Sequence, residues 1–484
     1  MLKQFARDSA IYGAATLLVR GISFLLLPFY TRVLSPGDYG LVDLATVFTT
    51  LVMLTVALEI SQGVARLFPD TQDQDARVAY SSTALWFTLA AYALFLAVSV
   101  PAAPILSEIV FESRDRDDLM RIVLVGSALN GVFYLLQQQL RWRLQPMAYT
   151  AAGLTFALVS IAATIGLVIV GNLGVRGVLF GQVIGAASGA AVAFVLARDL
   201  YRLRFDWGKL REMLLFSLPL VPSSAGVFVT LYIDRIAIKE LMTVADVGLF
   251  GIGYRIASLV SLLMMAIQMA ITPLVYARYR DPETPPALAR LFRYFVGVAL
   301  LVAVVLSLFA REILVVVTTP DYYAAAVVVP LLAPALLLSA MYVFAPGLGI
   351  AKRSGVQAVI TIAGAVLNTG LNFALIPLWG IVGAAAATLI SAAIVFVAYM
   401  VTSQRLYFVP HQWTRLVAAA LLAGVVCAVG ASVTLPALPA IGFKLLLATL
   451  AVAGVVGLGL VNTSELAVAV RSFRRARTEG ERLA

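Results

Sequence analysis

The sequence LSPGDYGL, residues 34–41, is a short polar turn between two long apolar stretches, and it returns in similar form as MTVADVGL, residues 242–249. Pro36 fixes its own backbone dihedral, and Asp38 can accept backbone N–H groups where the next helix begins. The turn therefore predicts a helix cap, and its return predicts a duplicated architecture. The paired residues are Ser9 and Ser217, Asp38 and Asp246, Gly40 and Gly248, and Leu41 and Leu249.

A second pair of stretches matches in the same order along the chain. LGVRGVLFGQVIGA, residues 173–186, aligns with WGIVGAAAATLISA, residues 379–392. Two such landmarks predict two six-helix halves, and because six is even, the halves form a parallel repeat about an axis along the membrane normal. Chance matching of small residues is the alternative. The predicted domains are a first bundle at 1–205, a second at 206–410, two added helices at 411–463 and a basic tail at 464–484.

Composition places the chain in the membrane. Hydrophobic residues make up 62% of it and charged residues only 12%, and the apolar runs reach the roughly 20 residues that one helical crossing needs. The predicted fold class is an all-α polytopic membrane protein with about fourteen transmembrane helices. The predicted spans are 10–33, 39–63, 79–101, 119–140, 147–171, 174–197, 212–238, 246–276, 291–311, 323–347, 356–377, 380–402, 413–434 and 440–462.

The distribution of charge predicts the orientation. The net charge is +10, yet most of the 35 Lys and Arg fall in segments on the same side as the N-terminus. Positive charge marks cytoplasmic loops, so both termini are predicted in the cytoplasm and nucleic acid is not an expected partner. The tail RSFRRARTEGERLA, residues 471–484, either lies against anionic lipid or is disordered.

Two residue types are too rare to build a site. Cys427 is the single cysteine, in an apolar run, and His411 is the single histidine, in an expected surface loop. Neither a disulfide nor a zinc site can form within the chain, and no cofactor or metal is expected.

The opening SAIYGAATLLVRGISFLLLPFYTRVLSPGDYGLVDLA and the later LNTGLNFALIPLWGIVGAAAATLISA, residues 367–392, resemble polysaccharide and O-antigen flippases of the multidrug, oligosaccharidyl-lipid and polysaccharide exporter superfamily. The resemblance implies a transporter, not an enzyme. It would move a polyprenyl-diphosphate-linked oligosaccharide from the inner to the outer leaflet of the bacterial cytoplasmic membrane by alternating access, for cell-surface polysaccharides such as lipopolysaccharide. The extra helix pair resembles the fourteen-helix branch that includes peptidoglycan-precursor flippases.

Charged residues inside spans are the candidate substrate and ion sites. Arg20 and Arg255 suit a diphosphate because a guanidinium presents a planar fork of donors and is costly in the membrane without a partner. An ion pair or snorkelling is the alternative. Asp43, Glu59 and Asp234 are candidates for a coupling proton or sodium ion, with a helix cap or ordinary ion pair as the alternative.

Uncharged polar residues inside spans are the candidate glycan contacts, with interhelical hydrogen bonding as the alternative. Those proposed for the substrate are Asn130, Gln137, Gln182, Gln268, Asn368 and Asn372. Prolines in or near spans can form hinges. They are Pro28, Pro219, Pro222, Pro273, Pro334 and Pro346.

Two other functions compete with a flippase. A cation-coupled multidrug antiporter of the same superfamily needs acids and aromatic residues in its cleft, so a central Arg20 counts against it. A membrane glycosyltransferase or polymerase needs a sizeable exposed segment, and the longest outward loop, about 102–118, is small. Membrane lipids and a polysaccharide polymerase are the further partners considered.

Overall fold

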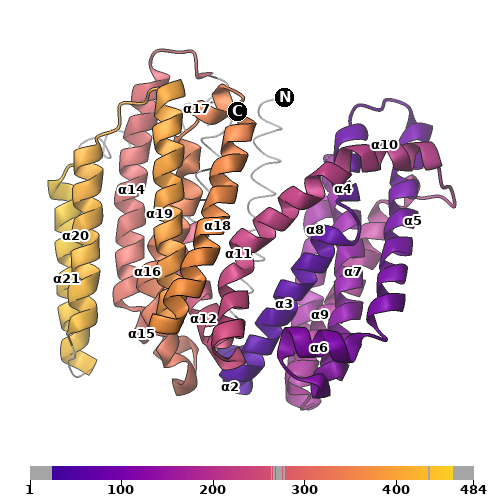
Figure 1. Ribbon diagram of the computed structural model, residues 1–484, viewed down its shortest axis with the longest axis horizontal. Helices are drawn as coiled ribbons and strands as arrows, with labels where there is room; N and C mark the ends of the chain where they lie inside the picture. The colour runs from indigo at the N-terminus through magenta and orange to yellow at the C-terminus, as the bar shows by residue number, and fades with distance from the viewer. Residues whose placement is uncertain are drawn as a thin grey trace, which may run out of the picture. The chain divides into compact units, whose positions relative to one another are not determined.

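The computed structural model shows an all-α protein in the part of the chain that it describes (Figure 1). That part comprises residues 24, 26–262, 264, 268, 275, 278–433 and 437–461, with the side chains of 437 and 438 excepted. Contacts divide the chain into two compact units. Unit 1 contains residues 1–252, 317–322 and 368–384, and unit 2 contains 253–316, 323–367 and 385–484.

Twelve helical segments of the described residues are long and apolar enough to cross a membrane. Each corresponds to one of the predicted spans. The predicted spans 10–33 and 246–276 include residues outside the described part. The total of about fourteen spans therefore remains a prediction. A span of roughly 20 residues matches the hydrocarbon core, which supports a multi-pass membrane protein.

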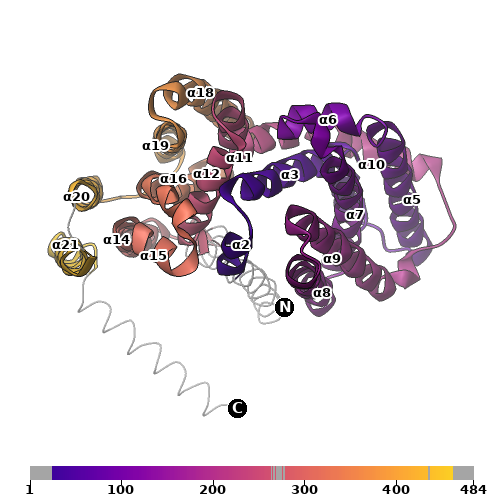
Figure 2. The same cartoon turned by 90° about the horizontal axis from the view of Figure 1, so that it is seen from below.

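Unit 1 is built around α7 (Asp117–Trp142), which packs against α3, α5, α8 and α9. Figure 2 shows α7, α8 and α9 side by side, viewed along their axes. The other helices of this unit are α2 (Leu27–Val33), α3 (Pro36–Thr55), α4 (Ile60–Leu67), α5 (Gln74–Ser99), α6 (Ala103–Phe111), α8 (Pro146–Ile165), α9 (Gly174–Leu196), α10 (Trp207–Ser217), α11 (Val221–Leu241) and the start of α12 (Val244–Ala257).

Small residues bring α8 and α9 together. Gly181 and Gly185 of α9 face Thr164 and Ser160 of α8, and a Cβ on either glycine would lie within 2.5 Å of those side chains. In a bilayer, where helix association depends on close packing, such small residues let backbones approach. The glycine spacing in the sequence therefore sets this helix pair.

The two copies of the polar turn are helix caps, as predicted. Ser35 is the N-cap of α3 and forms a capping box with Asp38, whose carboxylate accepts the Ser35 N–H. Asp246 accepts the N–H and hydroxyl of Thr243 in the same way. The N-cap is therefore the hydroxyl residue, and the aspartate three positions later completes the box.

The turns also pack against each other through their paired glycines. A Cβ on Gly40 would lie 1.9 Å from the carbonyl oxygen of Val244, and a Cβ on Gly248 would lie 2.0 Å from that of Pro36. The contact is reciprocal, so each copy of the turn requires a glycine at the same position.

The second landmark repeats its local geometry too. Gly174 and Gly380 both adopt left-handed backbone conformations, with φ of 50° and 58°. Gly177 and Gly383 both approach the preceding helix closely, within 2.9 Å and 2.2 Å for an added Cβ. These likenesses support duplication, while the domain boundaries remain a prediction.

Two predicted single spans are interrupted. The span 39–63 breaks between α3 and α4 at residues 56–59, where no glycine or proline stands. The span 212–238 is interrupted by a 3₁₀ turn, Leu218–Leu220, between α10 and α11; Pro219 lies in this turn and Pro222 in the first turn of α11. As a result α10 lies across the end of α5 (Figure 1). That these prolines act as a hinge stays a prediction.

Unit 2 contains the remaining helices. α14 packs against α16, α20 and α21, and the last two form an adjacent pair (Figure 2). Val304, Leu308 and Val426 belong to the core of this contact, and Lys444 of α21 donates to Glu312 of α15 at 2.6 Å. The helices are α14 (Thr284–Leu308), α15 (Ala310–Val317), α16 (Val329–Ala340), α17 (Gly347–Ile350), α18 (Ser354–Trp379), α19 (Ile381–Leu406), α20 (Trp413–Ser432) and α21 (Ala437–Gly457), of which α18 and α19 contribute residues 368–384 to unit 1.

His411 lies in a loop between α19 and α20, as expected, but its half-buried ring packs among aromatic side chains. Its ring lies 4.7 Å from that of Phe292 and 5.2 Å from that of Trp413, between centroids. Both ring nitrogens are buried without a hydrogen-bond partner, and burial lowers the pKa of His411 to about 4. Trp413 follows two positions later in the sequence, whereas Phe292 comes from the distant α14, which sequence proximity does not show.

Candidate functional site

A buried ion pair joins α3 to α11 in unit 1. The Nε of Arg235 donates to the Oδ2 of Asp43 at 2.7 Å, and the two side chains are only 7% and 9% exposed. The guanidinium also lies over the rings of Tyr232 and Phe250. Gly251 leaves room for the carboxylate, because an added Cβ would lie 2.9 Å from Asp43 Oδ2. Asp43 thus has a fixed cationic partner.

A second buried cluster joins α11 to α18 within the same unit. The Nδ2 of Asn372 donates to Asp234 Oδ1 at 2.7 Å and to the carbonyl of Asn368 at 3.0 Å. Asp234 is 3% exposed, Asn368 5% and Asn372 0%. The sequence placed the two asparagines on one helix face, and the structure adds the acid that Asn372 contacts.

Glu59 lies at the break between α3 and α4. Its Oε1 accepts a hydrogen bond of 2.6 Å from the hydroxyl of Ser224 in α11. The residue is 8% exposed and lines a small cavity with Thr88, Tyr92 and other residues. The sequence singled out the acid but not the helix break or the hydroxyl groups around it.

The predicted glycan contacts are not gathered in one place. Asn130 and Gln182 line a common cavity between α7 and α9, with a volume of about 10 Å³. Gln137 donates to the carbonyl of Tyr149 at 3.4 Å. Gln268 belongs to unit 2, where it donates to the carbonyl of Ala340 at 3.0 Å.

The two predicted diphosphate ligands are Arg20 and Arg255, and Arg20 lies outside the described residues. Arg255 lies in the last turn of α12, half-buried, and its carbonyl accepts the hydroxyl of Ser258 at 2.7 Å. The described residues contain no group of three His, Cys, Asp or Glu that could hold a metal ion.

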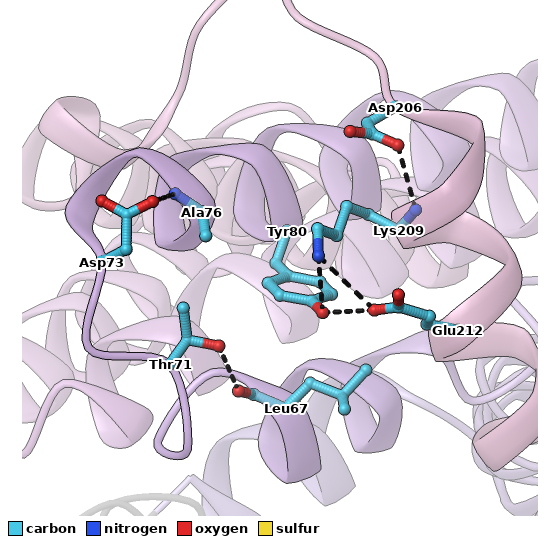
Figure 3. A network of polar contacts seen from close by, with 8 residues as sticks. All are labelled: Leu67, Thr71, Asp73, Ala76, Tyr80, Asp206, Lys209 and Glu212. Carbon is cyan, nitrogen blue, oxygen red and sulfur yellow. Dashed lines mark hydrogen bonds and ion pairs between the residues drawn. The ribbon is translucent and has the colours of Figure 1, made fainter.

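A polar network that the sequence did not reveal ties α10 to α5 (Figure 3). The Tyr80 hydroxyl donates to Glu212, and Lys209 lies 3.1 Å from that hydroxyl and 3.6 Å from Glu212. Asp206 caps α10 through the N–H of Lys209. The network fixes the short helix at the end predicted to face the cytoplasm. Its members are far apart in the sequence, so no local motif announces it.

Comparison with known sequences shows the family. A polysaccharide biosynthesis protein family matches residues 5–279. A protein of the Lsg locus of Haemophilus influenzae is 23% identical over 288 residues, which cover 57% of this chain and 67% of that protein.

Comparison with solved structures shows the fold. The lipid II flippase MurJ, in an inward closed conformation, matches with a TM-score of 0.73 at 12% identity, covering 93% of this chain and 98% of that one. An inward-facing multidrug resistance MATE family transporter of the MOP superfamily matches with a TM-score of 0.64 at 15% identity, covering 82% and 98%. A MOP superfamily transporter from Pyrococcus furiosus reaches 0.52 at 16%, covering 83% and 95%.

At such identities the structural likeness concerns the fold. The sequence match extends over more than half of the chain. The protein therefore belongs to the polysaccharide biosynthesis protein family, and it has the fold of the MOP superfamily transporters.

Proposed function

We propose that this protein flips a polyprenyl-diphosphate-linked oligosaccharide from the inner to the outer leaflet of the bacterial cytoplasmic membrane, by alternating access. The observation that carries the proposal is the likeness to a lipid II flippase over 93% of the chain, in a family described by polysaccharide biosynthesis. Membrane lipids surround the transporter, and a polysaccharide polymerase that uses the flipped lipid is the proposed protein partner.

The substrate sets the chemistry of its site. A diphosphate is anionic, and an arginine binds it through charge-assisted, bidentate hydrogen bonds. We assign this role to Arg20 and Arg255. Asn130 and Gln182 are the proposed glycan contacts, because they share a cavity in the present conformation. The hydrogen bonds of Gln137 and Gln268 to backbone carbonyls favour a role in tying helices together.

Of the candidate coupling acids, Glu59 and Asp234 fit the role better than Asp43. A coupling acid must exchange its cation during the cycle, whereas Asp43 is held by Arg235 at 2.7 Å. We therefore assign Asp43 to structure. Asn372 donates to Asp234 and to the carbonyl of Asn368, so we assign both asparagines to the Asp234 cluster and not to the sugar.

A multidrug antiporter is the second candidate function. Buried acids at Glu59 and Asp234 and a TM-score of 0.64 to a MATE transporter favour it. A cationic drug would be repelled by Arg20 and Arg255, whereas a diphosphate would be attracted. The sign of the charge that the cleft binds thus separates the two functions.

Reconstitution in proteoliposomes tests the flippase directly. The substrate is a polyprenyl-diphosphate oligosaccharide, and the measurement is the fraction of its glycan exposed to an impermeant glycosidase. Arg20→Ala is expected to abolish exposure and Arg20→Lys to restore it partly, because lysine supplies charge without the fork. The matched control is Arg121→Ala, which removes an exposed arginine paired with Asp117. Flipping by Arg20→Ala at the wild-type rate would remove Arg20 from the site.

A further inference from the structure

The segment that joins the two predicted halves, residues 201–206, is fixed to α5 through its backbone. The N–H of Arg202 donates to Ser82 Oγ at 2.9 Å, and the N–H of Asp206 donates to Thr83 Oγ1 at 3.0 Å. Side chains of α5 thus satisfy backbone groups that a loop would otherwise leave to water. The segment therefore follows a defined path along α5 and is not a free linker.

These contacts place the segment at the depth of the membrane surface. Ser82 and Thr83 lie near the start of the predicted span 79–101, and at 1.5 Å per residue they are roughly 5 Å inside its end. The indole Nε1 of Trp86 donates to the carbonyl of Arg202 at 2.9 Å, and tryptophan is typical of the headgroup level. The segment therefore runs where headgroups meet acyl chains, at the end predicted to face the cytoplasm.

Three large apolar side chains are exposed on this segment and at the start of α10. Leu203 is 92% exposed, Phe205 51% and Trp207 71%, and the ring centroids of Phe205 and Trp207 lie 6.3 Å apart. Leu203 and Phe205 lie outside any helix, so they do not belong to the lipid-facing side of a transmembrane helix. A group of exposed apolar side chains marks a contact surface.

The outer face of α10 continues this surface. Leu210 and Met213 belong to the core of unit 1, whereas Trp207, Arg211 and Leu215 are exposed. Residues four apart share one face of a helix, so the exposed face carries an aromatic, a basic and an apolar side chain. Because α10 lies across the end of α5 (Figure 1), this face runs along the membrane surface. Helices of this kind bind in the plane of the interface.

The sequence RLRFDWGKLR, residues 202–211, is also basic. It contains four Lys or Arg and one acid, Asp206, and that acid accepts the backbone N–H of Lys209 as the cap of α10. The contact of Arg204 with Asp75 is long, at 3.9 Å, and both side chains are exposed. Basic residues at this depth attract anionic lipid, and neighbouring apolar side chains add to the binding.

We propose that residues 202–211 form a binding surface for anionic phospholipids of the inner leaflet. The three exposed apolar side chains enter the acyl boundary, and Arg202, Arg204 and Arg211 bind the phosphate groups. The depth of the segment beside α5 favours lipid over a protein partner. Since the backbone is already held by α5, binding orders few groups. The surface lies within unit 1, and the inference does not depend on which substrate the protein transports.

The first test measures the binding of phosphatidylglycerol to the purified full-length protein in detergent, by native mass spectrometry, with phosphatidylcholine of the same acyl chains as the comparison. One variant combines Arg202→Gln, Arg204→Gln and Arg211→Gln, and a second makes the same three changes to lysine. The matched control removes three exposed arginines of unit 2 from segments that are also predicted to face the cytoplasm. Its changes are Arg278→Gln, Arg280→Gln and Arg290→Gln.

Phosphatidylglycerol is expected to bind in preference to phosphatidylcholine. The glutamine variant should bind it roughly tenfold more weakly or worse, because each charge near the surface contributes to binding, and the lysine variant should keep most of the affinity. The control should bind as the wild type does. An equal loss in the control would show that binding follows total charge and would overturn the assignment, as would the absence of a preference for phosphatidylglycerol.

The second test measures insertion and leaves the arginines in place, so it stands even if the glutamine variant does not fold. A nitroxide label is attached at Leu203→Cys in a Cys427→Ser background, in nanodiscs that contain phosphatidylglycerol. The label should be accessible to oxygen and shielded from a water-soluble nickel complex, whereas a label at the exposed Gln72→Cys should be open to nickel. Equal access of nickel to both labels, or a dimer that Leu203→Ser dissociates, would overturn the inference.

Discussion

At the scale of single residues, the pair of Asp43 and Arg235 shows how a charge is retained inside a membrane helix bundle. Its distance of 2.7 Å and the low exposure of both side chains leave little water to replace either partner. Loss of one partner from a buried pair costs about 3–5 kcal/mol, because the other charge stays buried. The pair is therefore a structural requirement of unit 1.

We expect Asp43→Asn to destabilise the protein by about 3 kcal/mol. Thermal unfolding of the purified protein in detergent measures this loss. Asp117→Asn is the matched control, because its pair with Arg121 is 30% and 54% exposed and should contribute less than about 1 kcal/mol. Equal losses in the two variants would show that burial does not matter to the pair.

His411 predicts a pH dependence of stability. Its pKa is lowered to about 4 by burial, whereas an unfolded chain would bind the proton near pH 6.5. Between these values the unfolded state holds more protons, so stability is full above pH 6.5 and falls as the pH drops toward 4. The melting temperature, measured from pH 7.5 to 5, should decline in the wild type and less in His411→Phe. The same decline in both would assign it to other groups.

The sequence identified polar residues in spans better than it identified their partners. Asn368 and Asn372 share a helix face, as their spacing predicts, yet the sequence could not show that Asp234 of another helix accepts a hydrogen bond from Asn372. Spacing along a helix is local information. Contacts between helices depend on how the helices pack. Residues that are close in the sequence do not show which residues of another helix they will contact.

At the scale of elements, some interruptions of helices coincide with prolines or glycines in the sequence, whereas the strained break between α3 and α4 does not. Pro219 lies in the 3₁₀ turn between α10 and α11, and Pro222 lies in the first turn of α11. Pro334, by contrast, lies inside α16, which continues through it. The hinge itself stays a prediction.

The break at Leu58 and Glu59, which have φ of 52° and 53°, has no such marker, because both residue types are good helix formers. The break is therefore attributed to contacts with other helices, such as the hydrogen bond between Glu59 and Ser224 of α11.

The reciprocal glycines of the two turns give a test at this scale. Gly40→Ala places a methyl group against the carbonyl of Val244 and should cost about 1–3 kcal/mol of stability. Gly370→Ala, also within a helix, meets open space and should be neutral or stabilising by up to about 1 kcal/mol. Thermal unfolding of both variants measures the difference. A Gly40→Ala protein as stable as the Gly370→Ala protein would contradict the close contact.

At the scale of the whole molecule, composition was sufficient for the fold class. Apolar runs predicted every one of the twelve described segments that could cross a membrane, because length and hydropathy suffice for that prediction. The predicted repeat rests on two landmarks, where glycine is needed for backbone geometry and close contact.

The most direct test of the central claim is the leaflet that holds the lipid-linked oligosaccharides in cells that lack the gene. We predict that these lipids accumulate on the inner leaflet of the cytoplasmic membrane, and that the intact gene reverses the accumulation while Arg20→Ala does not. An unchanged distribution of the lipids, together with new sensitivity to cationic compounds, would contradict a flippase and indicate a drug antiporter.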